Sequence, residues 1–136
     1  MDSAALSVYI ARGQSFAEGM KHLKDDPQHI NLLAAGLLAV HCAIAFNDAV
    51  LVKLTGSSGK SSDHKQAPEI TRKACRAKGL DSKTTERGLS HFVKLIQFKD
   101  RIADQGKPIS DAEILKYCET SERFETWVKP MLKGNL

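Results

Sequence analysis

Arg87 and His91 form the residue pair with the clearest chemical use, because they lie four positions apart in a segment with helical hydrophobic spacing. Residues i and i+4 of a helix share one face, which would place the guanidinium beside the imidazole. The guanidinium can hold a phosphate while the imidazole moves a proton, and metal-free RNA cleavage needs no more than this. Two solvated polar residues would show the same spacing, so the pair is a candidate catalytic site with a purely structural alternative.

His41 and Asp48 lie within a long apolar segment, Ile30–Val52, and their separation of seven residues places them on one helix face. An acid in apolar surroundings must find a partner or lose its charge. The two residues are either a base with its orienting carboxylate or structural groups. We favour the structural interpretation, in which Asp48 pairs with a basic residue of a neighbouring helix. Lys99 and Arg101 are the predicted partners.

The middle of the chain is basic. Residues 60–107 contain twelve lysines and arginines against six aspartates and glutamates, a net charge of +6, while the whole chain carries +4. A positive surface on a small protein suits phosphate-bearing partners such as nucleotides or RNA. A solvated helix face can have the same composition.

Other recognisable chemistries are missing from the sequence. The loop Gly56–Ser61 resembles a phosphate-binding P-loop in composition, but two residues separate its glycines where that motif needs four, and it follows a helical pattern where the motif follows a strand. The nucleophile motif of the α/β-hydrolases and the zinc-protease motif are also absent from the sequence. The sequence therefore favours a protein that is not an enzyme.

The histidines and cysteines show no metal-ligand spacing, so we expect no metal ion and no cofactor. Cys42, Cys75 and Cys118 are odd in number and far apart, which indicates reduced thiols used as small core hydrophobes. The first residues lack the basic and then apolar pattern of a secretory signal. A cytoplasmic location is the prediction.

Hydrophobic spacing of three and four residues recurs along the whole chain and predicts five helices. Three start signals support them: Asp26-Pro27 before the second helix, Asp63 with Gln66 before the third, and Ser110 with Glu113 before the last. The expected ranges are about 3–23, 27–54, 63–78 and 110–128, with a fourth helix that Asp81 or Ser82 caps and Gly106–Pro108 breaks, and with Gly79 ending the third.

The second predicted helix is apolar on every side, which is typical of a central bundle helix or a membrane span. His41, Asn47 and Asp48 limit its clean apolar stretch to about 15 residues, Leu32–Phe46, whereas a span needs about 20. We therefore predict an all-α, up-and-down bundle of four to five helices around a buried second helix. Residues 1–136 form one domain, and no membrane partner is expected.

Several segments together resemble the HEPN domain family of nucleotide-associated helical bundles. They are the small-residue helix Ala39–Ala49 leading to Gly56, the helix opening Asp63–Lys65, and the segments Leu95–Asp104, Ile109–Glu113 and Ser121–Val128. The resemblance covers most of the chain. It implies a bundle that commonly forms homodimers and whose members bind nucleotides, pair with small nucleotidyltransferases as toxin and antitoxin, or cut RNA without metal.

The resemblance also implies site residues. Members that cut RNA place four to six residues between an arginine and a histidine, whereas three separate Arg87 from His91. The predicted function is therefore non-catalytic binding of a nucleotide or RNA phosphate. A metal-independent ribonuclease and a purely structural or regulatory homodimer are the alternatives. The positions carried over as a binding cleft are Asp48, His64, Lys99, Arg101 and Asp104.

Overall fold

The structure is a computed structural model that describes residues 3–28, 30–58, 64–104 and 108–134, apart from the side chains of Ser3, Ala103 and Asp104. This part of the chain holds five α-helices, two short 3-10 helices and no strand. The elements are α1 (Ser3–Lys24), α2 (Leu32–Thr55), η1 (His64–Gln66), α3 (Ala67–Ala77), α4 (Ser82–Asp104), α5 (Asp111–Val128) and η2 (Lys129–Leu132). The predicted all-α helical bundle is confirmed.

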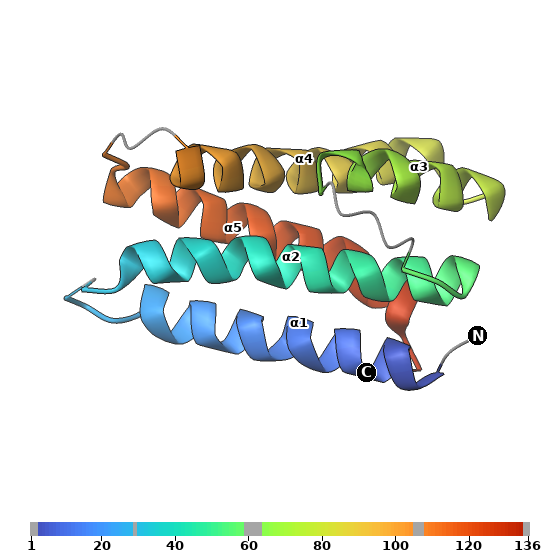
Figure 1. The fold of residues 1–136 in the computed structure, drawn as a ribbon, viewed down its shortest axis with the longest axis horizontal. Helices are drawn as coiled ribbons and strands as arrows, with labels where there is room; N and C mark the ends of the chain where they lie inside the picture. Colours follow the sequence, from blue (N-terminus) through green and yellow to red (C-terminus); the bar gives the residue numbers. More distant parts are fainter. Residues whose placement is uncertain (1–2, 29, 59–63, 105–107, 135–136) are drawn as a thin grey trace.

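The four long helices alternate in direction along the chain, as in an up-and-down bundle (Figure 1). The short helix α3 runs in the same direction as α2 and then turns back into α4, so it is an addition to one side of the bundle. Helix α2 contacts each of the other four helices. This central position explains why its sequence is apolar all the way round.

Helix α2 also has the length and composition of a membrane span, with a mean hydropathy of 1.8 over its most apolar 18 residues. In this structure, 72% of that window is buried within the protein. The four neighbouring helices remove from water the same hydrophobic surface that a bilayer would cover. The arrangement is that of a core helix.

One predicted helix start is wrong. Helix α2 begins at Leu32 and not at Pro27; the Asp26 carboxylate accepts a hydrogen bond from the backbone N–H of Gln28 at 3.1 Å in the turn that precedes it. This local bond stabilises a turn in place of the first turn of a helix. Asp63, the predicted cap of the third helix, lies outside the described residues, and α3 itself begins at Ala67.

Other predicted helix ends are confirmed. The Ser110 hydroxyl accepts a hydrogen bond from the Glu113 backbone N–H at 3.2 Å, which caps α5. Asp81 is the residue that caps α4, since its carboxylate accepts from the Thr84 N–H at 2.9 Å. Gly79 follows α3 with a φ of 71°, the left-handed conformation that glycine adopts without strain. Local capping chemistry thus sets the ends of three helices.

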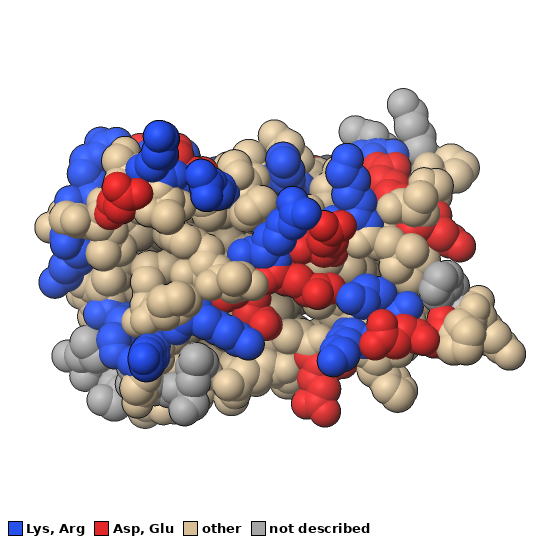
Figure 2. All heavy atoms as spheres, turned by 180° about the vertical axis from the view of Figure 1, so that it is seen from behind, with Lys and Arg blue, Asp and Glu red and all other residues tan. Residues whose placement is uncertain are grey.

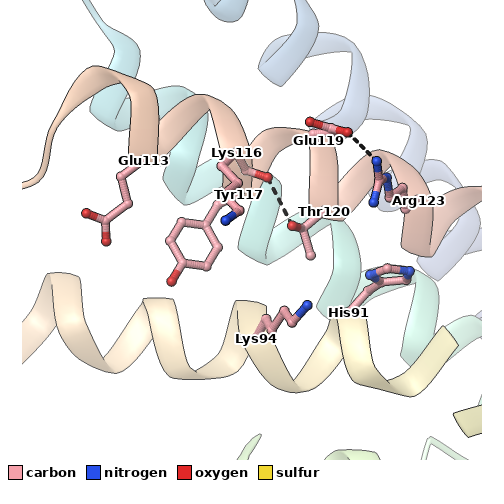
Figure 3. Close-up of a pocket in the computed structure, with 8 residues that line it drawn as sticks. All are labelled: His91, Lys94, Glu113, Lys116, Tyr117, Glu119, Thr120 and Arg123. Carbon is pink, nitrogen blue, oxygen red and sulfur yellow. Dashed lines mark hydrogen bonds and ion pairs between the residues drawn. The ribbon is translucent and has the colours of Figure 1, made fainter. Parts of the chain in front are cut away.

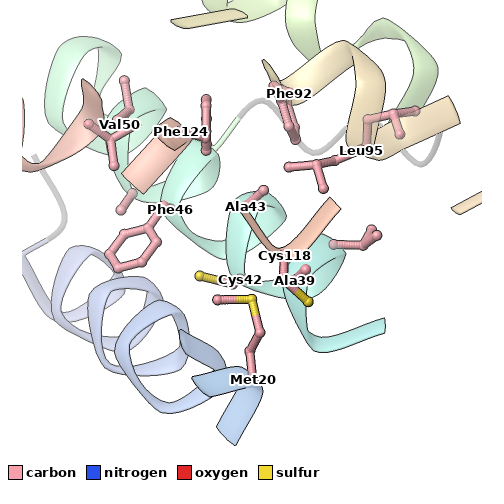
Figure 4. Packing of buried hydrophobic residues seen from close by; sticks show 14 of the residues in the cluster. Met20, Ala39, Cys42, Ala43, Phe46, Val50, Phe92, Leu95, Cys118 and Phe124 are labelled. Atoms are coloured by element: carbon pink, nitrogen blue, oxygen red, sulfur yellow. The ribbon is translucent and has the colours of Figure 1, made fainter. Parts of the chain in front are cut away.

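The core lies on both sides of α2 (Figure 4). The ring of Phe46 is directed toward α1, where it meets Gly13. Any side chain at this position would clash with the ring, because a Cβ at Gly13 would lie only 2.9 Å from the Phe46 ring atoms. The glycine therefore lets α1 pack closely on the ring. On the other side, the rings of Phe92 and Phe124 stack with centroids 5.1 Å apart and join α4 to α5. Close helix packing on two sides fixes the rotation of α2 about its axis.

Two buried hydrogen bonds fix the neighbours of α2. The Ser121 hydroxyl of α5 donates to the Ala39 carbonyl at 2.8 Å, and the Thr71 hydroxyl of α3 donates to the Asn47 side-chain oxygen at 2.7 Å. All three cysteines are buried and unpaired. Burial raises the pKa of the Cys42 thiol to about 12, so the thiol stays protonated and packs as a small hydrophobe.

Candidate functional site

The residues predicted to form one binding cleft are divided between two places in the structure. Asp48 and His64 line a small pocket formed by α1, α2 and the start of α3. Lys99 and Arg101 belong to the last turns of α4, beside the beginning of α2 (Figure 1). The side chain of Asp104 lies outside the described part of the chain. The predicted set is therefore not a single site.

The predicted ion pair between Asp48 and Lys99 or Arg101 is also wrong. Arg101 pairs with Glu113 of α5. The cation that acts on Asp48 is Arg12 of the neighbouring helix α1. Asp48 lies on the side of α2 that faces α1 and α3, so the end of α4 is not its neighbour.

The surroundings of Asp48 disfavour its charge. Burial raises the pKa of this carboxyl to about 6 from 3.8, and the positive charge of Arg12 offsets only part of the rise. The folded protein therefore holds this proton more tightly than the unfolded chain does. Ionisation of Asp48 thus lowers stability, with no effect below pH 3.8 and the full effect above pH 6.

We expect Asp48→Asn to stabilise the protein by about 1 kcal/mol at pH 7.5, because the variant avoids the cost of a half-buried carboxylate that solvent partly screens. Urea unfolding at pH 7.5 and pH 4.5 measures the change. The gain should shrink at the lower pH, where the native carboxyl is protonated. Glu18→Gln, which alters an exposed acid of α1, is the control. An equal gain for Asp48→Asn at both pH values would contradict the interpretation.

His41 is exposed and separate from Asp48. Its ring lies against Phe16 of α1, with centroids 5.9 Å apart. Partial burial and the positive charge of Lys99 both lower its pKa. A base with an orienting carboxylate would need the two side chains in contact, and the structure instead places Asp48 in the pocket beside Tyr9. The geometry favours a structural role for His41.

His91 lines a groove between α4 and α5 (Figure 3). Its volume is about 560 Å³, compared with about 200 Å³ for the pocket that holds Asp48. His91 and Lys94 extend into the groove from α4. The rest of the lining comes from α5 and consists of Glu113, Lys116, Tyr117, Glu119, Thr120 and Arg123. Its volume lies within the range of small-molecule sites, about 300 to 1,000 Å³.

Helical periodicity explains how α5 can line the groove and also fill the core. The groove residues Lys116, Thr120 and Arg123 follow one another at spacings of four and three. Cys118, Ser121 and Phe124 lie on a different face and are buried. The α5 residues of the groove are not among the residues predicted from the sequence. The polar stripe of Lys116, Thr120 and Arg123 at helical spacing is the feature of the sequence that indicates them.

The groove is electropositive around His91. Partial burial lowers the pKa of the imidazole, and the nearby charges of Lys94 and Arg123 lower it further. Two acids also line the groove. Glu113 pairs with Arg101, which lies outside the lining, whereas Glu119 accepts a 2.5 Å hydrogen bond from Arg123 and offsets part of the charge of that guanidinium. An anion that entered the groove would meet the ammonium groups of Lys94 and Lys116, and it would compete with Glu119 for Arg123.

The basic surface extends beyond the groove. Figure 2 shows lysine and arginine side chains gathered at one end of the back face, where α4 begins and α5 ends, and both signs of charge mixed over the rest. Exposed basic residues at this end are Lys83, Arg87, Arg123 and Lys129. Arg87 does not line the groove that holds His91. The two members of the predicted catalytic pair thus have different surroundings.

Comparisons of the chain with models of protein families, with curated proteins and with solved structures found no match. The resemblance to the HEPN family, and the homodimer and nucleotidyltransferase partner that it implies, stay predictions. Among the described residues, no group of three histidine, cysteine or acidic side chains is placed to hold a metal ion. Function must therefore be inferred from the side chains that line the groove and the pocket.

Proposed function

We propose that this protein is a non-catalytic binding module for a phosphate-bearing ligand, a nucleotide or RNA, which it holds in the groove between α4 and α5. The observation that carries the proposal is the convergence of His91, Lys94, Lys116 and Arg123 on one groove of about 560 Å³. This groove differs from the cleft predicted around Lys99 and Arg101, neither of which lines it.

Phosphate suits this groove better than a neutral ligand does, because Lys94, Lys116 and Arg123 line it. Arginine binds phosphate oxygens through two parallel N–H groups, and lysine adds a point charge. The Arg123 side chain is 63% exposed, so its ion pair with Glu119 is worth little and can be exchanged for a ligand. The hydroxyl of Tyr117 also borders the groove, while its ring stacks on Phe98 at a centroid distance of 3.9 Å.

The proposal assigns no catalysis to the site. A phosphate held by Arg123 and Lys94 would sit beside the His91 imidazole, but Arg87 lies outside the groove. We therefore assign no phosphate contact to the arginine that the sequence paired with His91. Incubation of RNA with the protein in the presence of a chelator should leave the RNA intact.

The test is a titration of the protein with pyrophosphate, nucleotides and short RNAs, in which binding is monitored through the NMR signals of the His91 ring. A bound anion should raise the pKa of His91, because it offsets the charges of Lys94 and Arg123. Lys94→Gln combined with Arg123→Gln should weaken binding by about tenfold or more. Lys83→Gln combined with Arg87→Gln removes the same charge outside the groove and should change affinity by less than about threefold.

Two results would overturn the proposal. Equal loss of affinity in both double variants would show diffuse attraction to the basic end of the molecule. No change in the His91 signals with any ligand would favour the structural homodimer. For that alternative, the exposed apolar residues Ile30, Leu33 and Leu37 at the start of α2 offer a surface, with exposed fractions of 71%, 47% and 38%.

A further inference from the structure

The pocket that holds Asp48 is a second candidate site, separate from the α4–α5 groove. It has a volume of about 200 Å³ and is formed by α1, α2, η1 and the start of α3, with Ser58 after the end of α2. Its lining residues are Tyr9, Asp48, Leu51, Ser58, His64, Ala67 and Ile70. This volume is below the usual range for drug-sized ligands, about 300 to 1,000 Å³, so the pocket suits a small group.

The pocket has one formal negative charge in its lining, and that charge is incompletely compensated. Among the described residues, none forms a hydrogen bond or ion pair with the Asp48 carboxylate. Arg12 acts on it through space, but the Arg12 side chain is exposed and its guanidinium carbon lies 5.9 Å from the centroid of the Tyr9 ring. A half-buried carboxylate without a direct partner favours a cation.

The other walls define what kind of cation fits. Leu51, Ala67 and Ile70 provide apolar surface, which suits a short aliphatic chain. The hydroxyls of Tyr9 and Ser58 are 3.4 Å apart and offer oxygen atoms beside the carboxylate. Hard metal ions are usually held by more than one charged or carbonyl oxygen, and Asp48 is the one carboxylate of the lining, whereas an alkylammonium group needs one carboxylate and an apolar wall. The lining therefore favours an organic cation.

We propose that the Asp48 pocket binds an organic cation, a primary ammonium or guanidinium group on a short aliphatic chain. The carboxylate pairs with the charged head, and Leu51 and Ile70 contact the chain. The group belongs either to a small amine or to a lysine or arginine side chain of another protein. The site is independent of the phosphate groove, so either proposal can fail without the other.

In the experiment, the full chain is titrated with n-butylammonium as the probe, and backbone amide NMR spectra at pH 8 report binding. We expect saturable shifts at residues 48–51 and at Ala67, Glu69 and Ile70. Asp48→Asn should weaken binding at least tenfold, and Glu18→Gln, which removes an exposed acid elsewhere on α1, should leave affinity unchanged. 1-Butanol has the same chain without the charge and should cause no comparable shifts. Equal binding of butanol, or of n-butylammonium by Asp48→Asn, would overturn the proposal.

A measurement on the native protein covers the case in which the Asp48→Asn variant fails to fold. The carboxyl carbon of Asp48 reports its ionisation, and saturating n-butylammonium should move its titration to lower pH because the cation stabilises the carboxylate. Binding should accordingly strengthen as pH rises from 5 to 7. Arg12, Tyr9 and His64 are the other titratable groups around the pocket, and the carbon signal separates Asp48 from them. An unchanged titration would contradict the proposed contact.

Agmatine and an acetylated lysine methylamide distinguish the two sources of the cation. The first is a free amine with a guanidinium, and the second presents a lysine side chain as a protein would. Tighter binding of the lysine compound assigns the pocket to a partner's side chain, and tighter binding of agmatine assigns it to a small amine. Failure of both, together with n-butylammonium, would overturn the proposal.

Discussion

Replacing Phe46 with alanine is expected to lower the free energy of unfolding by about 3 to 5 kcal/mol. Phe46 is fully buried at the centre of α2 and packs onto Gly13 of α1. Removal of its ring leaves a cavity that the close contact at Gly13 cannot fill, because glycine has no side chain to move into it. Urea unfolding followed by circular dichroism measures the loss.

Phe16→Ala is the matched control, since it removes the same ring from the same helix pair. Phe16 is only half-buried and lies against the exposed His41. Its loss should cost clearly less than that of Phe46, about 1 to 2 kcal/mol. Similar losses in the two variants would mean that the α1–α2 interface is not the rigid part of the core.

The helices could be predicted because their signals are local. Spacing of three and four marks one buried face, and Ser110 or Asp81 caps a helix through a backbone N–H three residues away. The start of α2 was mispredicted for a related reason. Asp26 can begin either a helix or an isolated turn. In both cases its carboxylate accepts a hydrogen bond from a backbone N–H shortly after it, here that of Gln28.

The candidate sites could be predicted only in part, because they depend on which helices lie side by side. The sequence indicated that Asp48 needs a partner but not that the cation acting on it is Arg12 of α1. It also indicated His91, but not that α5 faces it with Lys116 and Arg123. Charged residues at helical spacing occur on every solvated helix, so only the packing distinguishes a groove from a surface.

Gly88→Ala is the second large effect that we expect, with a net loss of about 1 to 3 kcal/mol in the free energy of unfolding. A Cβ at Gly88 would lie 2.2 Å from Cδ2 of the Trp127 ring, a distance that forces α4 and α5 apart or tilts the indole. Alanine gains about 1 kcal/mol in helix propensity, which is smaller than the cost of the overlap. Urea unfolding gives the difference.

Gly19→Ala is the control for propensity, because its Cβ would approach only the flexible end of Leu38, at 3.1 Å from Cδ1. That variant should be neutral or slightly stabilising. Trp127→Leu combined with Gly88→Ala should recover part of the loss relative to the sum of the single variants. An additive double variant would show that the indole is not what resists the new methyl group.

The close contact of Gly88 with Trp127 also connects stability to the proposed function. It lies one helical turn from His91 on α4 and one turn from Arg123 on α5, so it sets the separation of the two helices at that end of the groove. A wider separation moves the Arg123 guanidinium away from the imidazole. Gly88→Ala should therefore weaken pyrophosphate binding in protein that is still folded, and it should reduce the effect of Arg123 on the pKa of His91. Unchanged affinity in a destabilised variant would place the ligand elsewhere on the basic surface.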